Sequence, residues 1–78
     1  MGVDLARFRL IVGVTQQEIA NQTGLSQATI CRIEKKTQNP SGKALLSIQD
    51  WADQIASQKR IPMPDRLSWD WLRSWKAA

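Results

Sequence analysis

Histidine and tyrosine are absent from this chain of 78 residues, and cysteine occurs only once. Without histidine there is no imidazole base, and no serine or cysteine has an obvious partner that would activate it as a nucleophile. The seven acidic residues are scattered along the chain, so the composition argues against an enzyme. The single Cys31 cannot form a disulfide within the chain, and no plausible set of zinc ligands remains. We therefore expect neither a metal ion nor a cofactor.

Long apolar runs are also absent. The longest, "LIVGV" at residues 10–14, is far shorter than the roughly 20 residues that a membrane span needs. The first ten residues, "MGVDLARFRL", lack the basic-then-apolar pattern of a signal peptide. We therefore expect a cytoplasmic protein with no membrane partner. The formal net charge of +4 permits a nucleic acid as partner.

Apolar residues recur at helical spacing along most of the chain, and no segment has the pattern of a convincing strand. A first helix is predicted over residues 5–12, where Gly13 ends it. A longer one follows Ser41, which has the residue type of an N-cap. The apolar stripe predicted for this longer helix consists of Leu45, Ile48, Ala52 and Ile55.

The C-terminal part of the chain predicts a connector and a final helix. The run "QKRIPMPD" at residues 58–65 is typical of an extended connector, because a residue before proline is pushed out of the helical region. The final helix is expected to begin at Asp65 or Ser68. The sequence thus predicts an all-α domain of about five helices, with a core over residues 1–57. Residues 58–78 form the connector and a Trp-rich helix of the same domain, which is a candidate dimer surface.

The stretch "TQQEIANQTGLSQATICRIE" at residues 15–34 predicts two short helices joined by a tight turn. Thr15 and Glu18 have the spacing of a capping box, which begins the first of these helices. Gly24 ends it, because glycine readily adopts the left-handed conformation of a sharp helix exit. Ser26 then caps the second helix.

Residue sizes in the same stretch favour a helix-turn-helix, whose second helix lies in the major groove of DNA. Ala20 is small, as the close crossing of the two helices requires. Leu25 is expected under the turn, and Ile30 and Ile33 share one face of the second helix and would hold it down.

On these residues the chain resembles the lambda-repressor-like family, the phage repressor and Cro class of XRE-type bacterial regulators. The resemblance extends from Leu5 to Trp51 and includes "TQQEIA", "TGLS", "ATICRIE" and "NPS". It implies a fold of four or five α-helices. It also implies that the protein binds pseudo-palindromic double-stranded DNA as a homodimer.

The resemblance implies which side chains read bases. Gln27, Ala28 and Arg32 match the main base-reading positions, and Cys31 matches one that some members use. Their chemistry agrees, because Gln pairs with adenine, Arg pairs with guanine, and Ala or a thiol can meet a thymine methyl group. The alternatives are that Gln27 and Arg32 are ordinary surface residues and that Cys31 is a small filler.

A second set of residues is expected to contact DNA phosphates, and it comprises Thr15, Gln16, Thr29, Lys35, Lys36, Asn39 and Lys43. The resemblance implies that Gln16 also steadies Gln27. Amides at a helix N-terminus favour an anion, although Thr15 and Gln16 could be merely a solvated helix start. The lysines flank the proposed reading helix, where the DNA backbone would lie. Glu34 resembles a structural acid of the family in a local ion pair, and we expect no DNA contact from it.

Two positions depart from the family pattern. Thr23 stands where an apolar residue usually packs, and Lys36 stands where many members have the glycine that ends the recognition helix. A lysine at positive φ costs about 1 kcal/mol or more. We therefore expect the exit from this helix to have a different shape, with the Lys36 charge serving a phosphate instead.

The helix-turn-helix does not explain the four tryptophans. Trp51 is most simply a core residue. Trp69 and Trp71 are two residues apart, about 200° around a helix, so both cannot face one small core. With Trp75 they predict a dimer or partner surface, since aromatic residues are enriched at interfaces. The alternatives are that Trp69 covers the edge of the domain, or that the tryptophans stack on single-stranded bases.

Together these patterns predict a sequence-specific regulator that binds double-stranded DNA, a dimeric repressor of phage or plasmid type. One alternative is an antitoxin-type module, whose Trp-rich tail binds a partner protein while the helix-turn-helix regulates its own operon. Another is a domain that has kept the fold and binds only protein.

Overall fold

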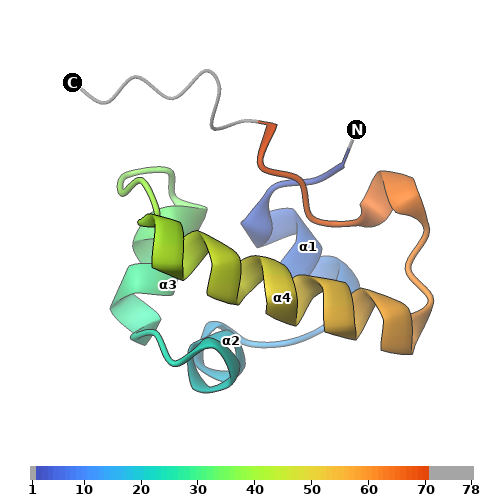
Figure 1. Cartoon of the computed structure of the whole chain (residues 1–78), viewed down its shortest axis with the longest axis horizontal. Helices are drawn as coiled ribbons and strands as arrows, with labels where there is room; N and C mark the ends of the chain where they lie inside the picture. The colour runs from blue at the N-terminus through green and yellow to red at the C-terminus, as the bar shows by residue number, and fades with distance from the viewer. Residues whose placement is uncertain (1, 71–78) are drawn as a thin grey trace.

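The computed structural model describes residues 2–70. This part of the chain contains four α-helices, α1 (Leu5–Val12), α2 (Gln16–Thr23), α3 (Gln27–Glu34) and α4 (Gly42–Lys59), and a 3-10 turn, η1 (Met63–Asp65). In Figure 1, α4 crosses in front of α1, with α2 below it and α3 to one side. The predicted all-α class is confirmed.

Side-chain caps set where each helix begins. The N-cap side chains of Asp4, Thr15, Ser26 and Ser41 each accept a hydrogen bond from a backbone amide three residues further on. At Thr15 the capping box is complete, because the Glu18 carboxylate also accepts from the Thr15 amide at 3.4 Å. Gly13 and Gly24 end α1 and α2 with φ of 75°. Helices this short are marginal alone, so packing must stabilise them.

One hydrophobic core lies between the four helices. Its fully buried large side chains are Leu5, Phe8, Ile19, Ile30, Ile33 and Ile48. The rings of Phe8 and Trp51 meet edge to face with centroids 5.6 Å apart, so Trp51 is a core residue.

The buried stripe of α4 is rotated from the predicted one. Ala44, Trp51 and Ala56 are buried beside Ile48 and Ala52, whereas Leu45 and Ile55 are only half-buried. The small alanines favour close approach of α4 to its neighbours, and the indole of Trp51 fills the remaining space.

The predicted start of the last helix is wrong. Residues 66–69, after η1, are not helical, and Leu67 forms a parallel bridge with Val3. The Val3 amide donates to the Arg66 carbonyl oxygen at 3.0 Å, and the Ser68 amide donates to the Val3 carbonyl oxygen at 2.9 Å. This pairing satisfies backbone groups of both chain segments. The rest of the predicted helix, including Trp71 and Trp75, lies outside the described residues.

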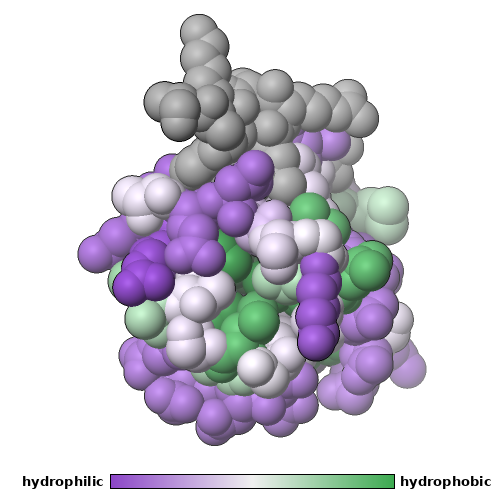
Figure 2. Space-filling model, turned by 60° about the vertical axis from the view of Figure 1, so that its left-hand side comes forward, coloured by the Kyte–Doolittle hydropathy of each residue, from purple (hydrophilic) through white to green (hydrophobic). Residues whose placement is uncertain are grey.

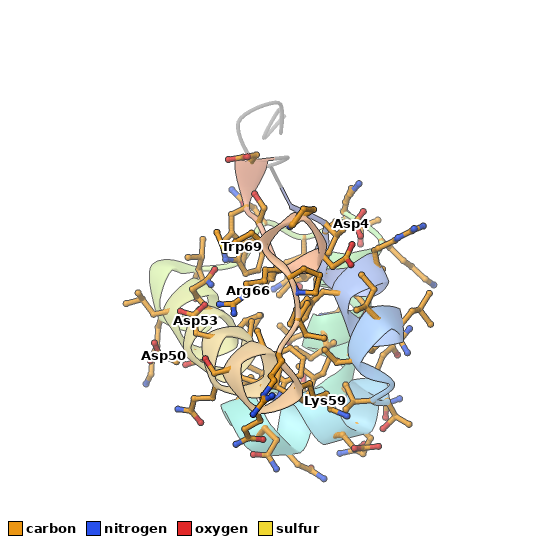
Figure 3. The ribbon with its side chains drawn as sticks, turned by 90° about the vertical axis from the view of Figure 1, so that its right-hand side faces the viewer. Asp4, Asp50, Asp53, Lys59, Arg66 and Trp69 are labelled. Atoms are coloured by element: carbon orange, nitrogen blue, oxygen red, sulfur yellow. The ribbon has the colours of Figure 1, made fainter. Side chains whose placement is uncertain are left out.

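The bridged C-terminal segment closes the core at the upper side of Figure 1. Leu67 is buried, and the half-buried Trp69 also packs against the core. Figure 3 shows Trp69 and Arg66 beside α4. Gly2 is required where the two segments meet, because a Cβ atom there would lie 2.6 Å from the Arg66 carbonyl oxygen. The alternative interpretation of Trp69, as a cover on the domain edge, matches this packing.

Replacement of Leu67 by alanine should lower the free energy of unfolding by about 2–3 kcal/mol, because it leaves a cavity beneath the segment. Urea unfolding followed by circular dichroism measures the change. Met63→Ala is the matched control, since Met63 is 70% exposed, and it should shift the stability by no more than about 0.5 kcal/mol. Equal effects of the two variants would contradict a core role for Leu67.

Candidate nucleic-acid interface

The two helices of the predicted helix-turn-helix are α2 and α3. Ala20 is only 3% exposed, as a close crossing of the two helices requires. The turn leaves α2 at Gly24, and Leu25 packs against the core beneath it. Ile30 and Ile33 of α3 are fully buried. Because Ile30 and Ile33 face the core, the side chains on the other faces of α3 point away from it.

The proposed base-reading residues lie along the outer side of α3. Gln27, Ala28 and Arg32 are exposed, and Cys31 is half-buried. Within residues 2–70 the Arg32 guanidinium donates a single hydrogen bond, a long one of 3.5 Å from Nη1 to Gln38 Oε1. Figure 2 turns the side of α3 towards the viewer and shows hydrophilic residues around a centre with some apolar surface. This face therefore offers amide, guanidinium and small apolar groups together.

Glu34, at the end of α3, joins three helices. Its carboxylate accepts from Arg9 Nε of α1 at 2.7 Å and from Arg9 Nη2 at 3.2 Å. It also accepts from Gln16 Nε2 of α2 at 2.9 Å. The Glu34 side chain is 5% exposed and that of Arg9 is 22% exposed, so water screens this pair little.

The ion pair of Glu34 is present, but it is not local, because Arg9 precedes Glu34 by 25 residues. Sequence analysis missed Arg9, and its position on α1 carries no local signal for this role. Gln16 is half-buried, and its amide donates to Glu34 rather than to Gln27. The structure therefore fixes the Gln16 amide at the first turn of α2.

Lys36 ends α3 in the left-handed conformation, with φ of 60°. The Lys36 amide donates to the Ile33 carbonyl oxygen and the Thr37 amide to that of Arg32, which is the Schellman pattern usually built on glycine. The expectation of a differently shaped exit is therefore wrong. Lys36 Nζ lies 3.2 Å from Asp4 Oδ2, and this ion pair helps to offset the cost of the backbone conformation.

Asp4 has two partners, the backbone amide of Arg7 and the ammonium group of Lys36. Partial burial raises the pKa of its carboxyl group, but the hydrogen bond from the Arg7 amide and the nearby Lys36 ammonium outweigh that effect. The pKa of Asp4 therefore lies below its ordinary value of 3.8.

The remaining predicted phosphate residues surround α3. Lys35, Asn39 and Lys43 are exposed, the first at the end of α3 and the others in the following loop and the first turn of α4. The hydroxyl groups of Thr15 and Thr29 already take part in the caps that begin α2 and α3. The predicted phosphate residues therefore lie at the start of both helices and along the chain that leaves α3.

Thr23 shows how a polar residue fits at a position where the family usually has an apolar one. Its hydroxyl group donates to the Ile19 carbonyl oxygen at 2.7 Å within α2. Because that bond satisfies the hydroxyl group, the half-buried side chain can pack at the end of the helix.

Two further findings concern residues 2–70. No three side chains that could ligate a metal ion gather in this part of the chain. None of its helices is long and apolar enough to cross a membrane.

Two capped helices at a glycine turn, with a buried inner and a polar outer side on the second, define a DNA-binding protein of the helix-turn-helix class. A family model described as helix-turn-helix matches residues 5–50, more than half of the chain. The chain belongs to this family, in its XRE or lambda-repressor-like form, and is a DNA-binding transcription regulator. Neither the curated proteins nor the solved structures gave a significant match.

Replacement of Glu34 by alanine should lower the free energy of unfolding by about 2–3 kcal/mol, because it leaves the half-buried Arg9 without its carboxylate. Chemical denaturation measures the loss. Asp50→Ala is the control, since it removes an exposed acid from α4 and should cost no more than about 0.5 kcal/mol. A loss for Glu34→Ala as small as that of the control would contradict the importance of this cluster.

The Asp4→Asn variant should lose stability only where Asp4 is ionised, because asparagine keeps the N-cap but cannot pair with Lys36. The lowered pKa means that this contribution is present above about pH 4 and is lost as the pH falls through the folded-state pKa. Its size should stay below about 1 kcal/mol, since both side chains are partly exposed. Urea unfolding at pH 7 and pH 2.5 tests this, and a stability difference that did not shrink between pH 7 and pH 2.5 would contradict the charge as its cause.

Proposed function

We propose that this regulator is a sequence-specific repressor that binds a pseudo-palindromic operator as a homodimer. It is of phage or plasmid type and acts in the cytoplasm of a bacterial or phage-infected cell. The observation that carries the proposal is the two-sided character of α3. Ile30 and Ile33 are fully buried on one side, and Gln27, Ala28 and Arg32 are exposed on the other.

In this proposal, α3 enters the major groove and its outer residues read bases. Gln27 donates to and accepts from the edge of an adenine, and Arg32 donates two hydrogen bonds to a guanine. Ala28 and Cys31 contact thymine methyl groups. The weak bond between Arg32 and Gln38 leaves little to break when the guanidinium turns towards a base.

The phosphate-contacting residues then lie on the DNA backbone beside that groove, where they set register rather than specificity. Thr15 and Gln16 approach one strand with the amides of the first turn of α2. Their approach is supported by the bond from Gln16 to Glu34, which orders the amide before DNA arrives.

Thr29 and the residues that follow α3 serve phosphates on either side of the groove, and these residues are Lys35, Lys36, Asn39 and Lys43. Lys36 must exchange Asp4 for a phosphate, since it is paired in the free protein. We therefore expect a smaller share of the binding energy from Lys36 than from Lys35 or Lys43.

Dimerisation would place two copies of α3 about 34 Å apart, in successive major grooves on one face of DNA. Residues 1–57 act as the DNA-binding core, and residues 58–78 supply the dimer surface with Trp69, Trp71 and Trp75. Because Trp69 already packs on its own core, Trp71 and Trp75 carry most of this surface. Repression would follow from occlusion of a promoter by the bound dimer.

Selection of bound sequences from random duplex DNA should return a palindromic consensus with half-sites one helical turn apart. On that site, Gln27→Ala and Arg32→Ala should each reduce the preference over random DNA by about 5-fold to 150-fold, since a good bidentate pair is worth about 1–3 kcal/mol. Fluorescence anisotropy at several salt concentrations measures the affinity of each variant for the consensus site and for random DNA. Non-specific, salt-sensitive binding should remain.

Lys59→Ala is the matched control, because it alters an exposed residue at the far end of α4. It should leave the consensus and the preference unchanged. Equal loss of binding to all sequences in the α3 variants would contradict base reading. Sedimentation of the free protein tests the dimer. A monomer with exposed aromatic residues would instead favour the antitoxin-type alternative.

A further inference from the structure

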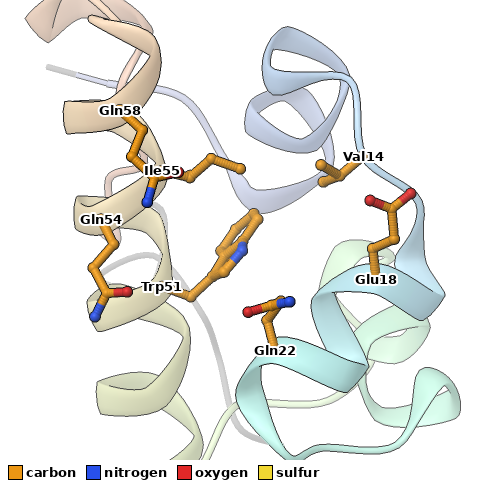
Figure 4. Close-up of a pocket in the computed structure, with 7 residues that line it drawn as sticks. All are labelled: Val14, Glu18, Gln22, Trp51, Gln54, Ile55 and Gln58. Carbon is orange, nitrogen blue, oxygen red and sulfur yellow. The ribbon is translucent and has the colours of Figure 1, made fainter.

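Two cavities adjoin between α2 and α4, with volumes of about 200 and 230 Å³. Both are lined by Gln22 of α2 and by Trp51 and Gln54 of α4. Because they share these residues, they form one groove, which we call the α2–α4 groove. Figure 4 shows its first cavity, with Trp51 between the two helices.

The groove combines a few apolar side chains with a larger polar surface that includes two acidic residues. Val14, Trp51 and Ile55 supply apolar surface. Glu18 lines the first cavity and Asp50 the second, and among residues 2–70 no lysine or arginine lines either of them. A cavity of about 150 Å³ holds benzene, so the first cavity, at about 200 Å³, is large enough for an aromatic side chain. The groove therefore fits a short segment that carries aromatic groups and positive charges.

The chain itself contains a segment of this chemistry. Residues 71–78, "WLRSWKAA", have two tryptophans and a leucine as their large apolar side chains, with Arg73 and Lys76 as their only charged side chains. We call this segment the tail. Its charges are opposite in sign to those of Glu18 and Asp50.

The tail is poorly placed to fill the groove of its own subunit. Figures 1 and 3 both show the segment before residue 71 at the opposite end of the molecule from α2. Trp75 lies five residues beyond Asp70, so it reaches at most about 18 Å from it when the chain is fully extended, and Trp71 reaches about 4 Å. A path around α4 would consume that length, whereas a second copy placed alongside can receive the tail in its groove.

We infer that two copies of this chain exchange tails, so that the tail of each lies in the α2–α4 groove of the other. The inference rests on the proposed homodimer and names the surface that holds it together. Two tryptophans from each tail, at about 150–250 Å² apiece, contribute about 600–1,000 Å² in all, and with the groove surface that they cover the buried area approaches the roughly 1,200 Å² of the smaller stable interfaces. Arg73 and Lys76 then face the acidic residues of the partner's groove.

Two variants separate the tail from the groove. One ends at Asp70 and keeps the groove. The other, Gln22→Lys/Gln54→Lys, keeps the tail but places two positive charges among exposed groove residues. Each alone should dimerise with a Kd at least about 100-fold above that of the wild type, because buried tryptophans dominate such interfaces. Mixed together they should form heterodimers, since one intact tail then meets one intact groove. Sedimentation equilibrium measures all three samples.

Gln17→Lys/Ser57→Lys is the matched control, because it adds the same charges to exposed positions of the same helices outside the groove. It should dimerise like the wild type. Trp75→Ser in the full chain replaces the truncation if the shorter chain fails to fold, as judged by circular dichroism. It should weaken dimerisation and be rescued by the groove variant in the same way.

The outcomes separate this inference from the proposed function. Wild-type dimerisation of the groove variant would overturn tail exchange and leave the proposed homodimer intact. If both variants lost dimerisation and formed no heterodimer on mixing, tail exchange would also be overturned. That result is expected when each tail docks in the groove of its own subunit. A monomeric wild type would overturn the homodimer and exchange together. Anisotropy with duplex DNA tests base reading independently on the same samples.

Discussion

The carboxylate of Glu34 lies where α1, α2 and α3 meet. The orientation of α3 depends on the hydrogen bonds that this carboxylate accepts from the other two helices. Arg9 and Gln16 both donate to it from the other two helices. A buried ion pair is weak evidence for stability by itself, because desolvation of the charges opposes their attraction. Its effect here is directional, since an apolar side chain at position 34 could fill the space but could not hold the Gln16 amide at the start of α2.

Ion pairs within the protein change how the positive charge of the chain should be counted. Arg9 is paired with Glu34 and Lys36 with Asp4, so two of the cations near α3 are already engaged within the protein. The cations that remain most available to a polyanion are Arg32, Lys35 and Lys43, which are exposed around α3. The net charge of +4 therefore says less about DNA binding than the positions of these three side chains do.

The hydrophobic core is closed at one end of the molecule by the C-terminal segment, and the α2–α4 groove lies open away from it. Three of the helices are only eight residues long, so they depend on a shared core for their stability. Leu67 and Val3 close that core from opposite ends of the described chain. Away from this closure the α2–α4 groove stays open, and Trp51 is one of the residues that line it. The helix α3 thus packs on a closed core, and the groove is a separate surface between α2 and α4.

Signals within a few residues of one another were sufficient to predict the helix-turn-helix. The capping box at Thr15, the glycine at position 24 and the small Ala20 act through neighbouring backbone groups, and the structure has each in its expected place. The four-residue spacing of Leu67, Trp71 and Trp75 obeys the same local rule, yet the chain at Leu67 pairs with Val3 instead. Only the tertiary structure decided this pairing, the partner of Glu34 and the ion pair of Lys36 with Asp4. Each depends on groups far apart in the sequence, whose contact must outweigh local preference and the entropy of closing a long loop.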